Sequence, residues 1–135
     1  MVSIQPQFSI FLVNKPGVLA SVTSTLAQAN VNITALAMMD SVDSGVLRFL
    51  CDAPDEARTV LNSSGDNWTE TDVLVVEVAH KPGAIADIAL KLAKAHISVA
   101  YAYVTGGIGD GRTSAIFKLA DTRRAYEVLS QGESE

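Results

Sequence analysis

Cysteine, aromatic side chains and positive charge are all scarce in this chain of 135 residues. The single cysteine, Cys51, excludes an internal disulfide, and we expect it to be a small apolar core residue. Ten Lys and Arg against fifteen Asp and Glu give a formal charge of −5, which argues against nucleic acids and membranes as partners, because both attract clustered basic side chains. No apolar run approaches the roughly 20 residues that span a bilayer, and the N-terminus lacks the pattern of a signal peptide. We therefore expect a cytoplasmic protein.

Patterns typical of catalysis or metal binding are also missing. The two histidines, His80 and His96, have no cysteine or carboxylate at ligand spacing, so we expect no zinc. No serine lies in a nucleophile elbow, and Cys51 has no base nearby in the sequence. The glycine-rich segment 106–111 lacks the lysine of a phosphate-binding loop and predicts a hairpin loop between two strands. We therefore expect neither a cofactor nor an enzymatic activity.

What the chain does contain is an internal repeat. Residues 14–20, Asn-Lys-Pro-Gly-Val-Leu-Ala, return at 80–86 as His-Lys-Pro-Gly-Ala-Ile-Ala, an offset of 66 residues. The match continues without a gap, since residues 26–33 align with 92–99 at the same offset. A period this long exceeds a solenoid unit and predicts two copies of one small domain. Each copy is near the lower size limit for an independent core, so we expect it to depend on the other copy or on a second chain.

Hydrophobic periodicity predicts the same order of elements in both copies. In the first copy it indicates strands at 8–13, 31–37, 46–51 and 68–72, and helices at 16–29 and from Pro54 onward. In the second copy it indicates strands at 73–79, 97–104 and 113–119, and helices at 82–95 and 121–129. The order β-α-β-β-α-β is the ferredoxin-like arrangement of an α+β fold, an antiparallel sheet with helices on one face. We place the first domain at 1–72 and the second at 73–135.

The second copy lacks a full last strand. After its last helix only residues 131–135 remain, Gln-Gly-Glu-Ser-Glu, which are too few and too polar for a convincing strand. An unfinished sheet edge has to be covered or paired. We expect another chain or the N-terminal residues 2–6 to supply the cover, and an incomplete copy favours at least a dimer.

The repeated Lys-Pro-Gly lies where a strand ends and a helix begins. There the first N–H groups of the helix are unpaired and the helix dipole is positive, a combination that binds carboxylates and phosphates. Gly17 and Gly83 lack a Cβ, so a ligand can approach the backbone closely. With Asn14 before the turn and Asn32 as a second amide, the pattern suits a zwitterion such as a free amino acid. The alternative is structural, because Pro-Gly also starts helices and Asn caps them.

Two copies that contain Asn-Lys-Pro-Gly-Val-Leu and Ala-Asn-Val-Asn-Ile resemble the ACT domain, a regulatory module that binds small molecules. The motifs are similar to those of the serine-binding ACT domain of phosphoglycerate dehydrogenase, and the chain looks most like tandem ACT proteins without a catalytic domain. The resemblance implies that Asn14 and Asn32 contact an amino acid across an interface between domains. The other ligand-binding candidates in these motifs are Pro16, Gly17, Val18, Leu19 and Ile33.

The chain departs from that pattern at three positions. The histidine that the family places two residues before the first Asn is Leu12 here. The second copy has His80 at the position of Asn14 and Ser98 at the position of Asn32, so it binds a different ligand or none. The candidates in the second copy are His80, Gly83, Ala84, Ile85 and Ser98.

Two functions fit this sequence. The favoured one is a regulatory amino-acid sensor, a homodimer in which the backbone N–H groups of Gly17, Val18 and Leu19 hold the ligand carboxylate, and whose change of state a partner enzyme or transporter detects. The alternative is an interaction module without a ligand, in which the turns are structural and the sheet edges pair with a partner or with another copy.

Overall fold

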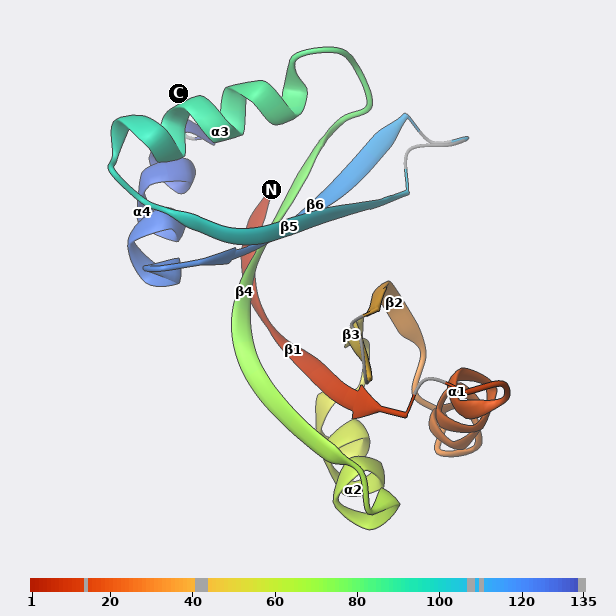
Figure 1. Ribbon diagram of the computed structural model, residues 1–135. Coiled ribbons are helices and arrows are strands. Elements are labelled where there is room, and N and C mark those ends of the chain that lie inside the picture. Colours follow the sequence, from red (N-terminus) through yellow and green to blue (C-terminus); the bar gives the residue numbers. More distant parts are fainter. Residues whose placement is uncertain (14, 41–43, 107–108, 110, 134–135) are drawn as a thin grey trace. The chain divides into compact units, whose positions relative to one another are not determined.

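The computed structural model describes residues 1–13, 15–40, 44–106, 109 and 111–133 (Figure 1). Its strands are β1 (Val2–Leu12), β2 (Ile33–Asp40), β3 (Gly45–Cys51), β4 (Asn67–Ala79), β5 (Val99–Gly106) and β6 (Arg112–Leu119). Its helices are α1 (Val18–Gln28), α2 (Pro54–Ser64), α3 (Ala84–Lys94) and α4 (Thr122–Glu133). This order confirms the expected α+β fold of two ferredoxin-like repeats.

The chain forms two compact units, and the N-terminus belongs to the second. The first unit is Pro6–Thr71, and the second combines Asp72–Glu135 with Met1–Gln5. The strand order β2-β3-β1-β4-β6-β5 gives the first unit β2-β3-β1-β4 and the second unit the N-terminal part of β1 followed by β4-β6-β5. Both are the ferredoxin-like order. The junction at Thr71–Asp72 is one residue from the expected boundary, but residues 1–5, expected in the first domain, lie in the second unit.

The core of the first unit lies between its helices and one face of its sheet. Phe8 and Ile10 of β1 pair with Phe49 and Leu47 of β3, and all four side chains are buried. Because strand side chains alternate between faces, these residues point to the same side and pack against residues of α1 and α2. Cys51 packs against this cluster half-buried, and burial raises the pKa of its thiol.

The core of the second unit is completed by the first residues of the chain. Val2 is buried and Ile4 half-buried in a cluster with Leu74 of β4 and residues of α3, β6 and α4. The Glu77 N–H donates a hydrogen bond of 2.9 Å to the Met1 carbonyl. Of the two expected sources of cover for the unfinished sheet, the structure shows the N-terminal residues.

Three elements differ from the sequence expectation. The strands expected at 68–72 and 73–79 are one strand, β4, because no glycine or proline interrupts the extended chain there. Strand β1 begins at Val2 rather than at residue 8, since its polar residues alternate with Val2 and Ile4, which point into the core. Helix α2 continues to Ser64 and ends at Gly65, whose φ of 81° is left-handed, as is common at helix C-termini.

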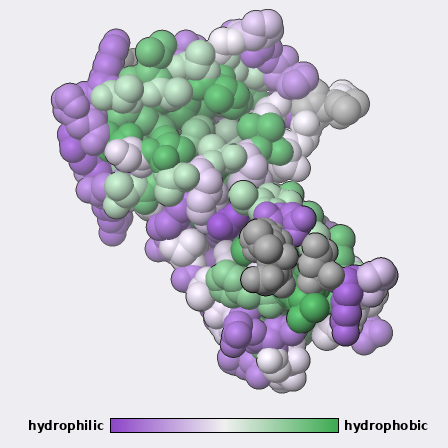
Figure 2. Space-filling model, in the orientation of Figure 1, coloured by the Kyte–Doolittle hydropathy of each residue, from purple (hydrophilic) through white to green (hydrophobic). Residues whose placement is uncertain are grey.

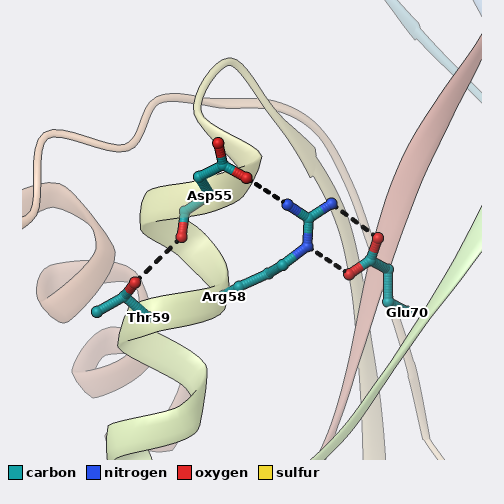
Figure 3. Close-up of polar contacts among 4 residues, drawn as sticks. All are labelled: Asp55, Arg58, Thr59 and Glu70. Atoms are coloured by element: carbon teal, nitrogen blue, oxygen red, sulfur yellow. Dashed lines mark hydrogen bonds and ion pairs between the residues drawn. The ribbon is translucent and has the colours of Figure 1, made fainter.

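A guanidinium on α2 joins this helix to β4 within the first unit (Figure 3). Arg58 donates from Nε and Nη2 to the two carboxylate oxygens of Glu70 at 2.7 and 2.8 Å, and from Nη1 to Asp55 Oδ1 at 2.6 Å. It also lies over the Phe8 ring, 5.7 Å from the centroid. The two hydrogen bonds from Arg58 lower the pKa of Glu70. These hydrogen bonds attach the beginning of β4, which belongs to the first unit, to α2.

We expect Glu70→Gln to lower the thermal midpoint by a few degrees at pH 7. Because the folded-state pKa of Glu70 is lowered, its ion pair stabilises the fold above the unfolded-state pKa of about 4.3 and stops doing so as pH falls through the folded-state value. The gap between wild type and variant should therefore close in acid. Asp55→Asn is the control, since the Asp55 side chain is 92% exposed and its removal should change little. A gap that persists at pH 2 would contradict this role.

We expect Val2→Asp to destabilise the second unit by about 1–3 kcal/mol, because it places a carboxylate in an apolar core. Hydrogen exchange should then speed up at the Glu77 amide and along β6. Ser3→Asp is the matched control, since Ser3 is half-buried and its side chain points to the opposite face of the same strand. Equal exchange in the two variants would show that the N-terminal strand does not complete this sheet.

Candidate functional site

The turn that opens the first helix has the same geometry in both units. In the first unit the Lys15 N–H donates to the Val13 carbonyl at 3.0 Å, and Gly17 follows with a φ of 88°. The second unit repeats this geometry with a φ of 91° at Gly83. Among the described residues other than the chain neighbours, none places an atom within 4 Å of a Cβ built on either glycine. Glycine is therefore required by the backbone conformation, and the space beside the turn is open.

The start of α1 presents unpaired backbone donors. The Gly17 carbonyl accepts from the Ser21 N–H at 3.0 Å, and no side chain caps the helix. Among the described residues, nothing accepts a hydrogen bond from the N–H groups of Val18, Leu19 and Ala20. Free donors at the positive end of a helix dipole favour an anionic group such as a carboxylate.

A hollow of about 420 Å³ lies beside this turn. It is lined by Lys15, Pro16, Gly17, Val18, Ser21, Val22, Ser64 and Asp66. The lining combines an ammonium, a carboxylate and two hydroxyls around two half-buried valines. In the described part of the chain, neither the Lys15 nor the Asp66 side chain has an ion-pair partner. Sequence motifs did not indicate Ser64 and Asp66, because the two residues belong to no motif and follow the turn by about 50 residues.

The structure does not bring Asn32 to the turn within the first unit. Leu12, at the end of β1, pairs with Gly45, which also pairs with Asp40. Ile33, next to Asn32, pairs instead with Cys51 at the other end of β3. The seven residues of β3 separate the two places by about 20 Å. Asn32 and Ile33 therefore lie apart from Pro16, Gly17, Val18 and Leu19, and Asn14 lies outside the described residues.

The backbone N–H and carbonyl of Asn32 are both hydrogen-bonded, so its side-chain amide is the polar group that remains exposed. The Asn32 N–H donates to Asp52 Oδ1 at 2.9 Å, and its carbonyl accepts from the Asp52 N–H at 3.1 Å. The residue itself is exposed. Its side chain is thus held at the beginning of the edge strand β2 and faces away from the core of the unit.

Residues of the second copy have other contacts. His80 Nδ1 is hydrogen-bonded to Thr113 Oγ1 at 3.0 Å, and the backbone N–H of His80 donates to the Gly111 carbonyl at 2.8 Å. The Ser98 carbonyl accepts from the Ala120 N–H at 3.1 Å, at the far end of α3 from the turn. Near the turn, Ala84 is buried while Gly83 and Ile85 are exposed. His80 thus joins the turn to β6.

The edge strands β2 and β5 expose apolar side chains. In β2, Leu36 and Met38 are 41% and 44% exposed, and Asp40 is its one charged residue. In β5, Val104 is 57% exposed and the strand has no charged residue. Figure 2 shows a largely apolar area where Figure 1 places α3 and β5. Edge strands with exposed apolar side chains and few charges are typical of strands that pair with another chain.

Two ferredoxin-like units with the same glycine turn define the class of this protein, a tandem of small α+β modules. The family model described as "ACT domain pair" matches residues 2–134, and the chain belongs to this family. This match confirms the resemblance to the ACT domain that the sequence indicated. ACT domains are regulatory modules. None of the described helices is long and apolar enough to cross a membrane. Within the described residues no group of three His, Cys, Asp or Glu could hold a metal ion.

Solved structures share this fold. A protein from Bacteroides thetaiotaomicron superposes with a TM-score of 0.90 at 29% identity, over 98% of this chain and 90% of that one. The ligand-free regulatory subunit of aspartate kinase from Thermus thermophilus gives 0.70 at 15% identity, over 97% and 96% of the two chains. The corresponding subunit from Thermus flavus gives 0.61 at 17% identity, over 96% and 95%. No curated protein matches the chain significantly.

We expect Gly17→Ala to cost about 1 kcal/mol of stability, because alanine is strained at positive φ even where space is open. Gly83→Ala should cost a similar amount. Gly45→Ala is the control, since its φ is not positive and a Cβ there would make ordinary contacts at 3.5 Å. Urea unfolding measures all three variants. Equal stability of Gly17→Ala and Gly45→Ala would show that the turn does not constrain the backbone.

Proposed function

We propose that the chain is a regulatory sensor that binds a free amino acid at the Lys15–Gly17 turn of its first unit and has no catalytic activity. The observation that carries this proposal is the free N–H pair of Leu19 and Ala20 beside a hollow that contains both Lys15 and Asp66. An amino acid has one anionic and one cationic group. The turn offers a counterpart for each within one small hollow.

The chemistry of the hollow assigns a role to each group. The carboxylate of the ligand accepts from the N–H groups of Leu19 and Ala20 and pairs with Lys15. The ammonium pairs with Asp66. The hydroxyls of Ser21 and Ser64 leave room for a small polar side chain, although Ser64 Oγ also donates to the Leu61 carbonyl at 2.9 Å. A small polar amino acid such as serine therefore fits best.

A second copy of the chain can supply the amide that the first unit keeps at a distance. If β2 pairs antiparallel with β2 of another copy, the Asn32 end of one strand lies beside the Asp40 end of the other. The turn before α1 lies at the Asp40 end of the sheet. Exposed Leu19, Leu36 and Met38 would be buried by such pairing, which supports a homodimer. Asn14 and Asn32 would then contact the ligand across an interface between domains, as the resemblance implies.

Regulation follows from linkage. A ligand held by two chains binds the associated form better than the separate chains, so it shifts that equilibrium by its difference in affinity. A partner enzyme or transporter that recognises one form would respond to the amino acid. The alternative, an interaction module without a ligand, is favoured only by the exposed apolar side chains of the edge strands.

We expect thermal unfolding with millimolar free amino acids to reveal the ligand. A ligand at 100 times its dissociation constant adds about 2.7 kcal/mol, and each kcal/mol raises the midpoint by a few degrees. Asp66→Asn and Lys15→Ala should abolish the response to a small polar amino acid, as should Asn14→Ala, while leaving the midpoint without ligand nearly unchanged. Asp72→Asn is the control, because Asp72 is exposed and lies outside the hollow.

A midpoint that no amino acid changes would refute the sensor and favour the interaction module. Light scattering distinguishes the roles further, because the sensor requires the amino acid to change the fraction of dimer, whereas the module forms the same assembly with or without it. Met38→Lys should weaken the dimer in either case by placing a charge on the β2 edge.

A further inference from the structure

The second unit has a hollow of its own at the corresponding place. Its volume is about 370 Å³, and it lies between α3 and the end of β4, with α4 at its back. Four of its lining positions correspond to lining positions of the first hollow at the 66-residue offset: Lys81 to Lys15, Ala84 to Val18, Asp87 to Ser21 and Ile88 to Val22. The duplication therefore preserved the hollow together with the turn.

The inner surface of the second hollow is apolar. Val76, Ile88 and Leu129 line it and are each only 5–6% exposed, so their side chains form its floor rather than its rim. The first hollow instead has hydroxyls, with Ser21 at the position of Asp87 and Ser64 near its other wall. An apolar floor favours an aliphatic group, since burying it removes apolar surface from water.

The rim of the second hollow has charges of both signs. Lys81 and Lys91 supply ammonium groups, and Glu77 and Asp87 supply carboxylates. All four residues are exposed, and in the described part of the chain their side chains form no ion pair with one another. A zwitterion with an aliphatic side chain would pair with both kinds of charge while its side chain covers the floor.

We propose that this hollow is a second binding site, separate from the first, for an amino acid with an aliphatic side chain. Lys81 pairs with the carboxylate, Asp87 with the ammonium, and the side chain contacts Val76, Ile88 and Leu129. The inference rests on the proposed function of the first unit, because Lys81 stands at the position that Lys15 has in the first hollow. The two units then differ in specificity through the residues at positions 21 and 87 and through the floors of their hollows.

The test is titration calorimetry of the full chain with leucine and with serine as the two probes. Wild type should bind both, and serine at saturation should leave the leucine isotherm in place, because the sites are separate. Asp87→Asn and Lys81→Ala should weaken leucine binding roughly ten- to hundredfold through loss of a charged contact, and serine binding should not change. Asp66→Asn should do the reverse, which makes it the matched control.

Each result decides one site. Absence of leucine binding, or leucine binding unaffected by Asp87→Asn and Lys81→Ala, would overturn the second site. Serine that competes with leucine for a single site would overturn it as well. If wild type binds leucine but not serine, the first site is contradicted and the second is supported. The substituted residues are exposed, so we expect each variant to fold like wild type, and urea unfolding of each variant checks this point.

Discussion

The structure depends on the division of two strands between the two units. Strand β1 completes the second unit with Met1–Gln5 and then runs through the first, while β4 completes the first with Asn67–Thr71 and then runs through the second. Apolar side chains hold the N-terminal segment, and the pair of Arg58 with Glu70 holds the first part of β4. Neither sheet is complete without a strand that also belongs to the other unit. This arrangement explains how copies of such small size can each form a core.

The same two strands carry the two turns. Strand β1 leads into the turn before α1, and β4 leads into the turn before α3. In each turn a glycine at positive φ fixes the first N–H groups of the helix, and a hollow beside it is lined by a lysine. The units keep this common frame and differ in the residues around it, which is how one fold can provide two different specificities.

Much of the fold could be predicted from the sequence. Parts of the candidate site could not, and the reasons can be identified. The 66-residue repeat, the order of elements and the glycine turns follow from spacing and periodicity, and the unfinished second copy correctly indicated the N-terminal strand as one source of cover. Asp66 and Ser64 were missed because contacts between distant segments leave no local pattern. The position of Asn32 could have been foreseen, since the 11-residue helix α1 carries the chain about 16 Å away from the turn.

The proposed sensor depends on the start of α1 holding the carboxylate of an amino acid. ¹⁵N–¹H NMR of the full chain during titration with the amino acid that raises the thermal midpoint most tests this directly. We expect the amide signals of Leu19 and Ala20 to shift most and to move downfield, as happens when an N–H begins to donate to a carboxylate, and Asp66→Asn to reduce these shifts. If these two amide signals stay unchanged while the ligand binds, the carboxylate is held elsewhere and the proposed site is wrong.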